Sequence, residues 1–215
     1  MIAIFGGTFD PFHFGHLKLI RHCMKYLQPD ELRLMPCYQS VHKSAAHGGV
    51  EHRLAILRLA ISELPAHWAD KCVIDEREIA SSRPVYTYET LTGLRQELGA
   101  DVCLVFVMGA DSLLNLHQWG HWQEILELVH LAVFTRPGYS LGQLDAQVRQ
   151  QLQQRQVRTV AELSQKPSGA IWVDDTMAAD VSSSGLREQR DSREQWLSDK
   201  IRAYIDAHHL YNDTH

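Results

Sequence analysis

A continuous apolar run at residues 102–108 (VCLVFVM) constrains the fold of this chain more than any other segment. A run without polar alternation is typical of a parallel strand that other elements cover on both faces. Shorter runs at 1–5 (MIAIF) and 131–134 (LAVF) have the same character. A sheet built on such strands needs helices on both of its faces. The sequence therefore predicts an α/β protein.

Helical patterns lie between the predicted strands, and they alternate with further short strands along the whole chain. Because the crossovers of such a chain are right-handed, the carboxyl ends of the strands meet at one edge. We expect a Rossmann-like, mostly parallel sheet with helices on both faces, in a single domain over residues 1–215. The expected helices are 16–26, 51–64, 87–98 with Thr87 as N-cap, 119–128, the Gln-rich 141–156 and 193–208. The further strands are 31–35, 73–76 and 170–173.

Composition and charge exclude several classes of protein. The chain has 215 residues, of which 45% are apolar and 22% charged, as in an ordinary globular domain. Its net charge of −5 argues against a protein whose main task is to coat nucleic acid or an anionic membrane. The first residues form no basic leader, and no apolar run approaches the ~20 residues of a membrane helix. We therefore expect a cytoplasmic protein without nucleic-acid or membrane partners.

The cysteines form no C-x-x-C pair and have no regular spacing. This pattern predicts neither a zinc site nor a disulfide framework, so we expect reduced and mostly buried thiols. They are Cys23, Cys37, Cys72 and Cys103.

The segment after the first strand, residues 6–16 (GGTFDPFHFGH), carries the strongest chemical signal. A glycine turn that leads into a helix exposes main-chain N–H groups and forms an anion site. If the helix begins near residues 11–13, His13 and His16 lie on one face of its first turn and reach the same phosphate. Gly15 between them has no side chain to block a ligand.

Four other patterns compete for this segment, and the first two are excluded. It lacks the G-K-[ST] ending of a Walker A loop and the spacing of the dinucleotide G-x-G-x-x-G pattern. Two incidental histidines beside a glycine turn are one alternative reading. A His-x-x-His zinc pair is another, although no third or fourth ligand is near it in the sequence.

The same segment closely resembles the GGTFDPxHxGH signature of the HxGH nucleotidyltransferase superfamily, and specifically its bacterial nicotinate-nucleotide adenylyltransferases. Residues 181–187 (VSSSGLR) are similar to the superfamily's ISSTxIR motif. Without the family, that second segment would be interpreted as a helix cap with a surface arginine. Segments similar to this branch of the superfamily recur along essentially the whole chain: 83–87 (RPVYT), 109–112 (GADS), 118–122 (QWGHW), 136–138 (RPG) and 204–211.

The chain departs from the family pattern at three places. Ser40 and Val41 stand before His42-Lys43 where two prolines are common, and Ser184 replaces the usual threonine. Gly120 stands where an aromatic residue is common.

The resemblance implies that the 5′-phosphate of nicotinate mononucleotide attacks the α-phosphorus of ATP, forming nicotinate adenine dinucleotide and pyrophosphate in NAD biosynthesis. The attacking oxygen is already ionised at pH 7, so the protein works by positioning and by neutralising charge. Mg2+ is expected as a cofactor bound mainly through the ATP phosphates. The implied partners are the two small-molecule substrates, and the protein is expected to be a monomer or a homodimer.

The resemblance also implies roles for individual residues. The catalytic group that meets the phosphates and the leaving pyrophosphate is His13, His16, Lys43 and Arg187. ATP is expected to contact the main chain of Gly7, Thr8 and Phe9, together with Gly109, Asp111, Ser182 and Ser183. The mononucleotide is expected at Thr87, Trp119, Gly120 and Arg136, where main-chain N–H groups near Thr87 and Gly120 donate to a carboxylate and favour nicotinate over nicotinamide. Trp122 is expected in the core, and Asp10 is expected to cap the turn.

Two other functions compete with this one. The first is another transferase of the superfamily, such as a pantetheine-phosphate adenylyltransferase or a cytidylyltransferase. The second is a regulatory nucleotide-binding domain without catalysis, which the presence of both histidines, Lys43 and Arg187 argues against.

Overall fold

The fold is built on one seven-stranded sheet with the strand order β3-β2-β1-β4-β5-β7-β6. The computed structural model describes residues 1–39, 47–81, 83–135, 141–175 and 196–211. Each pairing between neighbouring strands of this sheet is parallel. The predicted α/β architecture with a mostly parallel sheet is confirmed. The strands are β1 (Ile2–Gly7), β2 (Glu31–Pro36), β3 (Cys72–Ile74), β4 (Leu104–Gly109), β5 (His130–Phe134), β6 (Gln156–Val157) and β7 (Ile171–Asp174).

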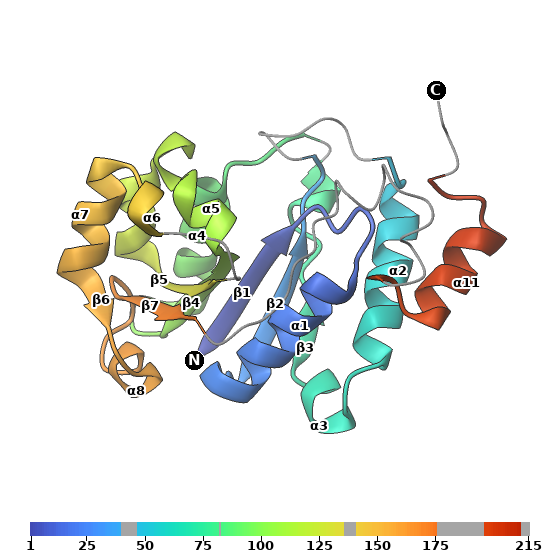
Figure 1. Cartoon of the computed structure of the whole chain (residues 1–215), viewed down its shortest axis with the longest axis horizontal. Helices are drawn as coiled ribbons and strands as arrows, with labels where there is room; N and C mark the ends of the chain where they lie inside the picture. Colours follow the sequence, from blue (N-terminus) through green and yellow to red (C-terminus); the bar gives the residue numbers. More distant parts are fainter. Residues whose placement is uncertain (40–46, 82, 136–140, 176–195, 212–215) are drawn as a thin grey trace.

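Helices cover both faces of the sheet (Figure 1), and each face has its own cluster of buried apolar side chains. Helix α1 (Phe14–His22) continues into the π-helical turn η1 (Cys23–Leu27). The first cluster includes side chains of α1, η1, α2 (Val50–Ser62), α8 (Val160–Leu163) and α11 (Asp199–Ala207). The second includes side chains of α4 (Thr87–Leu98), α5 (Ala110–Leu114), α6 (Trp122–Leu128) and α7 (Ala146–Arg155). The short helix α3 (Ala66–Ala69) follows α2, and 3-10 turns lie at η2 (Ile79–Ser81), η3 (Leu116–Gln118) and η4 (Leu141–Gln143).

The central strand β4 explains the continuous apolar run of the sequence. All of its residues are buried. Val105 and Val107 belong to the first cluster, whereas Leu104 and Phe106 belong to the second. Because successive side chains of a strand point to opposite faces, a strand covered on both sides needs apolar residues at every position.

Several element boundaries differ from the prediction. The helix expected from residue 119 begins at Trp122, and the unpredicted α5 and η3 lie between it and β4. Thr87 is the first residue of α4 rather than its N-cap, which is Tyr86. The helix expected over 141–156 begins at Ala146. The Asp145 side chain accepts hydrogen bonds from the main-chain N–H groups of Gln147 and Val148, and this cap fixes the first residue of the helix.

The last predicted helix, over 193–208, is described from Asp199, with Ser198 as its N-cap, and residues 193–195 lie outside the described residues. The chain also forms β6 and α8, which the sequence did not predict. Elements of two to four residues are too short to show a hydrophobic period.

The topology places a crevice beside β1. From β1 the chain moves to β2 and then to β3 in one direction, and it returns to the other side of β1 for β4. This reversal is a topological switch point, where ligands bind outside the carboxyl ends of the strands in open α/β sheets. At that edge β1 ends at Gly7 and β4 ends at Gly109.

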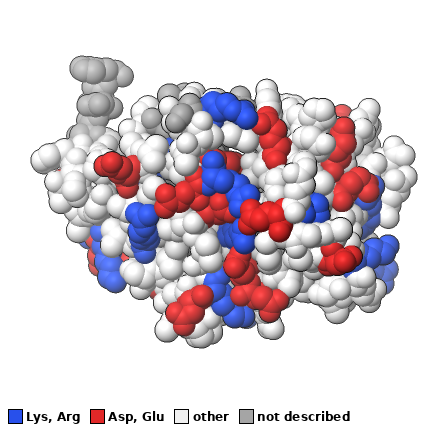
Figure 2. All heavy atoms as spheres, turned by 180° about the vertical axis from the view of Figure 1, so that it is seen from behind, with Lys and Arg blue, Asp and Glu red and all other residues white. Residues whose placement is uncertain are grey.

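Positive and negative side chains are mixed on the face of the molecule seen from behind. Figure 2 shows Lys and Arg interleaved with Asp and Glu across the face seen from behind, without a field of one sign. Among the described residues, none of the helices has the length and apolar character needed to cross a membrane.

Candidate active site

A cavity of about 460 Å³ opens beside the switch between β1 and β4. One wall is the glycine turn, which runs from Gly6 and Gly7, the last residues of β1, into Thr8, and a second is the segment that follows β2. The remaining walls come from α4, α5 and the turn before α6. These walls include Gly7, Thr8, Cys37, Thr87, Asp111 and Trp119. The cavity therefore brings together segments that the sequence singled out separately.

A buried phenylalanine holds the glycine turn. Phe9 is fully buried and has a φ of 46°, in the left-handed region. Its ring packs edge-on against those of Phe5 and His16, with centroid separations of 5.3 and 5.1 Å. A Cβ atom at Gly7 would lie 3.2 Å from the Phe9 ring, tighter than ordinary contact. Since the Phe9 side chain belongs to the core, only its main chain is available for the contact predicted from the sequence.

His13 and His16 together form the N-terminal cap of α1. Nδ1 of His13 accepts hydrogen bonds from the main-chain N–H groups of Gly15 at 3.0 Å and His16 at 3.4 Å. Nδ1 of His16 accepts from the main-chain N–H of His13 at 3.3 Å. A neutral imidazole that accepts at Nδ1 carries its proton on Nε2. The cap therefore fixes in both rings the tautomer whose Nε2 is a hydrogen-bond donor.

The two imidazole rings are stacked, with centroids 3.8 Å apart and an angle of 22° between their planes. The spacing argument is thus confirmed: both rings lie on one side of the first turn. His13 is buried and His16 is partly exposed. Their contact with phosphate stays a prediction.

The zinc alternative gains no further ligand from the fold. In the part of the chain that the structure describes, no three His, Cys, Asp or Glu side chains form a group able to hold a metal ion. Both Nδ1 atoms of the histidine pair are also engaged in the helix cap.

Gly109 and Asp111 meet at the end of β4. Gly109 is the N-cap of α5, and Asp111 lies in the first turn of that helix and lines the cavity. A Cβ atom at position 109 would lie 2.5 Å from Oδ1 of Asp111, so only glycine allows this close approach. The Asp111 carboxylate thus lies against Gly109 at the cavity wall.

One part of the cavity is aromatic. Thr87, Trp119 and Gly120 all line it. The Trp119 ring packs edge-on against Phe106, with centroids 6.1 Å apart. Tyr86 is 48% exposed, and its ring lies over Gly120, where a Cβ atom would be 3.3 Å away. The space beside Gly120 is therefore occupied by Tyr86. Trp122 is buried in the second cluster, as predicted.

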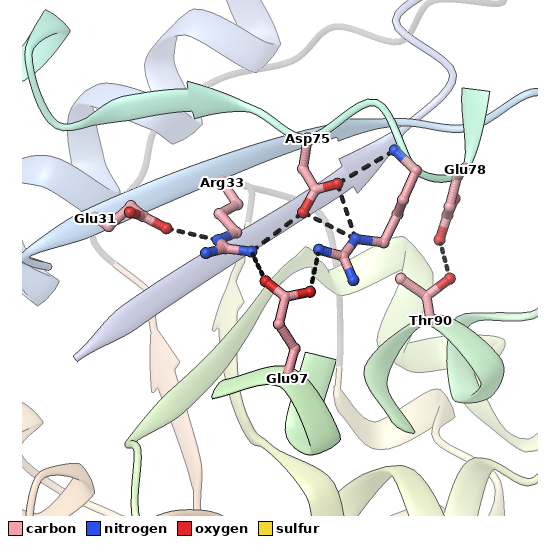
Figure 3. Close-up of polar contacts among 7 residues, drawn as sticks. Glu31, Arg33, Asp75, Glu78, Thr90 and Glu97 are labelled. Atoms are coloured by element: carbon pink, nitrogen blue, oxygen red, sulfur yellow. Dashed lines mark hydrogen bonds and ion pairs between the residues drawn. The ribbon is translucent and has the colours of Figure 1, made fainter. Parts of the chain in front are cut away.

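Sequence reasoning missed Glu78, which also lines the cavity. Oε1 of Glu78 accepts a hydrogen bond from the Thr90 hydroxyl of α4 at 2.6 Å (Figure 3). Burial, with a further contribution from Asp75, raises the pKa of Glu78 above the ordinary glutamate value despite the Thr90 bond and nearby Arg77. No motif or periodicity marks this residue, because its partner becomes a neighbour only through the fold.

A charged network fixes the segment that carries Glu78 (Figure 3). Nε of Arg77 donates to both carboxylate oxygens of Asp75 at 2.8 and 2.9 Å, and Nη2 donates to Glu97 of α4 at 3.0 Å. Arg33 of β2 donates to Asp75 at 3.3 Å. Burial acts to raise the pKa of Asp75, but the bonds from Arg77 and the charge of Arg33 outweigh it and lower that pKa. The network joins β2, the segment after β3 and α4.

Comparison with known proteins identifies the family. A family model described as cytidylyltransferase-like matches residues 4–189. A protein of Yersinia pestis (strain Pestoides F) named "Probable nicotinate-nucleotide adenylyltransferase" is 36% identical over 214 residues, which cover 98% of this chain and 95% of that protein. A protein of the same name from Serratia proteamaculans (strain 568) is 35% identical, with 97% and 94% covered. The chain belongs to the nicotinate-nucleotide adenylyltransferase family.

The fold of this family also appears in a distant structure. The chain is similar to a Plasmodium falciparum nicotinic acid mononucleotide adenylyltransferase solved in complex with NaAD, with a TM-score of 0.76. The two proteins share 16% identity, and the similarity covers 99% of this chain and 98% of that one. At this identity the likeness establishes the shared fold.

Asp10 of the family signature lies away from the cavity. It is buried, and its carboxylate accepts from the main-chain N–H groups of His47 and Gly48 at 2.7 and 2.8 Å. The Tyr211 hydroxyl donates to the same carboxylate at 2.9 Å. Asp10 therefore joins its own turn to His47, Gly48 and Tyr211, which are distant from it in the sequence.

Five predicted site residues of this family member lie outside the described residues. They are Lys43, Arg136, Ser182, Ser183 and Arg187. Their roles stay predictions.

Proposed function

We propose that this member of the family transfers the adenylyl group of ATP to the phosphate of nicotinate mononucleotide, releasing pyrophosphate. The observation that carries the proposal is that one cavity holds both the glycine turn after β1 and the aromatic end at Thr87, Trp119 and Gly120. These two ends suit the triphosphate and the pyridine ring respectively. The reaction joins two nucleotides, so both must lie in one continuous site.

The histidine pair supports the phosphate end. A neutral ring that carries its proton on Nε2 donates a hydrogen bond to an anionic oxygen without a change in protonation. His13 and His16 are proposed to donate to the ATP phosphates, with main-chain groups of Gly7, Thr8 and Phe9. Such donors stabilise the charge that develops on the leaving pyrophosphate. Lys43, Arg187, Ser182 and Ser183 are proposed to complete this end, and Mg2+ to enter as part of the ATP substrate.

We assign the adenosine and the pyridine ring to the walls of the cavity formed by α4, α5 and the turn before α6. Gly109 and Asp111 are proposed to meet the adenosine ribose, with the carboxylate accepting from hydroxyl groups. Trp119 is proposed to stack on the pyridine ring. Main-chain N–H groups at Thr87 and Gly120, together with Arg136, are proposed to hold the nicotinate carboxylate. An amide NH2 cannot accept those bonds, so nicotinate is preferred over nicotinamide.

The test is pyrophosphate release from ATP and Mg2+ with either nicotinate or nicotinamide mononucleotide. We expect turnover that prefers nicotinate, and a loss on the order of 10² or more in His16→Ala. His67→Ala, a change at an exposed histidine of α3, is the matched control and keeps the wild-type rate. Turnover of phosphopantetheine but of neither mononucleotide would assign the chain to another transferase of the superfamily.

A further inference from the structure

Arg53 of α2 is a buried cation that pairs with no carboxylate among the described residues. Its side chain is 1% exposed and is among the largest fully buried side chains of the molecule. Nη1 donates to the carbonyl oxygens of Thr8 at 3.0 Å and Cys37 at 2.7 Å, and Nη2 donates to that of Tyr38 at 3.0 Å. Nε is buried and has no partner. Within the described part of the chain, each of its polar contacts is to a main-chain carbonyl.

This arrangement is costly for a structural residue. Removing a guanidinium from water costs several kcal/mol, which proteins usually offset with a carboxylate partner. Carbonyl dipoles satisfy the N–H groups, but they leave the net positive charge uncompensated. An anion that binds close by would compensate this charge.

Two of the three residues whose carbonyls Arg53 binds line the cavity. Thr8 and Cys37 both line the cavity, and their carbonyl oxygens are bound to Arg53 inside the protein. The carbonyl of Gly7 is likewise occupied, by the main-chain N–H of Cys37 at 3.0 Å. Carbonyl oxygens that faced a triphosphate would repel it, whereas N–H groups attract it. Three acceptors beside the anion site are thus held in internal bonds.

We infer that Arg53 is a positioning residue of the phosphate site: it holds the carbonyls of Thr8 and Cys37 inside the protein and places a buried positive charge directly behind the glycine turn. The ligand class is the polyphosphate of a nucleotide. This inference rests on the proposed function, because it takes the glycine turn to be the place where ATP phosphates bind. It adds a residue that carries charge to the site without touching the substrate.

Arg95 provides a matched control. It too donates mainly to main-chain carbonyls, those of Leu128, Gly99, Ala100, Val102 and Pro167. These carbonyls precede β4, β5 and β7, so Arg95 lies at the amino edge of the sheet, opposite the cavity. Replacing either arginine removes a carbonyl-bound cation, but only Arg53 is next to the cavity.

The experiment measures binding by calorimetry, without turnover, for wild type, Arg53→Met, Arg53→Lys and Arg95→Met. Inorganic pyrophosphate with Mg2+ is the probe for the phosphate end, and adenosine is the probe that carries no phosphate. We expect Arg53→Met to weaken pyrophosphate binding by about tenfold or more and to leave adenosine binding unchanged. Arg53→Lys keeps the charge but loses the fixed fork of donors, so its loss is intermediate. Arg95→Met binds both probes as wild type does.

The outcomes separate this inference from the proposed function. Equal pyrophosphate affinity in Arg53→Met and Arg95→Met would overturn the role of Arg53 and leave the proposed function intact. A wild-type protein that binds no pyrophosphate would overturn both. Should Arg53→Met fail to fold, Arg53→Lys decides: a selective loss of pyrophosphate binding supports the inference, and unchanged binding of both probes refutes it.

Discussion

His16 serves two purposes at one position, and the two can be separated by substitution. Its Nδ1 closes the capping box of α1, and its Nε2 is the proposed donor to phosphate. Glutamine at the third helical position also accepts from the N-cap N–H, as in ordinary capping boxes. We expect His16→Gln to unfold close to the wild-type temperature, whereas His16→Ala loses about 1 kcal/mol of stability.

Both His16 variants are expected to lose adenylyl transfer on the order of 10² or more, because neither presents the imidazole Nε2–H. Thermal unfolding and initial rates measured on the same preparations check this. A His16→Gln protein with the full rate would show that the histidine is retained for its cap alone.

Glu78 gives a prediction about pH and stability. Its pKa is raised in the folded protein, so the folded state holds this proton more tightly than the unfolded state does. The stability that comes from the proton is complete below the ordinary glutamate pKa and is lost as pH rises through the folded value. Glu78→Gln removes this loss and keeps an oxygen acceptor for Thr90.

We therefore expect the Glu78→Gln variant to melt about 1–3 °C above wild type near neutral pH, with the difference shrinking toward about pH 4. Thermal melts across that range, without substrates, measure the effect. Glu63→Gln, at the C-cap of α2, is the control and shows no such trend. A Glu78→Gln protein that is less stable than wild type at every pH would contradict the argument.

At the scale of elements, the network of Arg77 sets the position of α4 relative to the segment that carries Glu78. Arg77 joins Asp75 to Glu97 near the end of α4, and Glu78 joins the same helix near its start. Arg77→Met is expected to loosen the mononucleotide end and raise the KM for the mononucleotide about three- to tenfold. The KM for ATP stays unchanged.

Steady-state kinetics with each substrate varied in turn test this split. Arg58→Met is the control, because Arg58 forms an exposed ion pair with Glu76, the neighbour of Arg77 in the chain. Exposed pairs of this kind contribute little. Equal increases in both KM values for Arg77→Met would mean that the network supports the fold as a whole rather than one end of the cavity.

The elements predicted well from sequence are those with a long period or a continuous apolar run, such as β4 and α4. The helix α5 was missed because five residues show no hydrophobic period. In the site, the glycine turn and the histidine pair follow from local spacing. Arg53 and Glu78 do not follow from local spacing. Arg53 bonds to Thr8, 45 residues away in the sequence, and a single arginine in a helix is normally interpreted as solvated. Glu78 bonds to Thr90, which becomes its neighbour only through the fold.

At the scale of the whole molecule, Tyr211 ties the end of the described chain to the first motif. Its hydroxyl donates to the buried Asp10 carboxylate, as do the main-chain N–H groups of His47 and Gly48. Tyr211→Phe removes that donor at a cost of about 1–3 kcal/mol, which lowers the melting temperature by about 2–4 °C per kcal/mol. Calorimetric melts check this prediction, with Tyr26→Phe, at an exposed tyrosine, as control. An unchanged melting temperature in Tyr211→Phe would show that water replaces the hydroxyl.

The bond between Asp10 and Tyr211 also has a consequence for how the protein is made. The two residues are separated by 201 positions, and the strands leave the ribosome in an order different from their order in the sheet. β1 is synthesised before its neighbour β4, which emerges only after the described helices α1, α2, α3 and α4 and the strands β2 and β3. The carboxylate of the signature motif receives the Tyr211 hydroxyl later still. The first motif to be translated is therefore among the last parts of the molecule to be completed, and an interrupted chain carries the signature without a finished site.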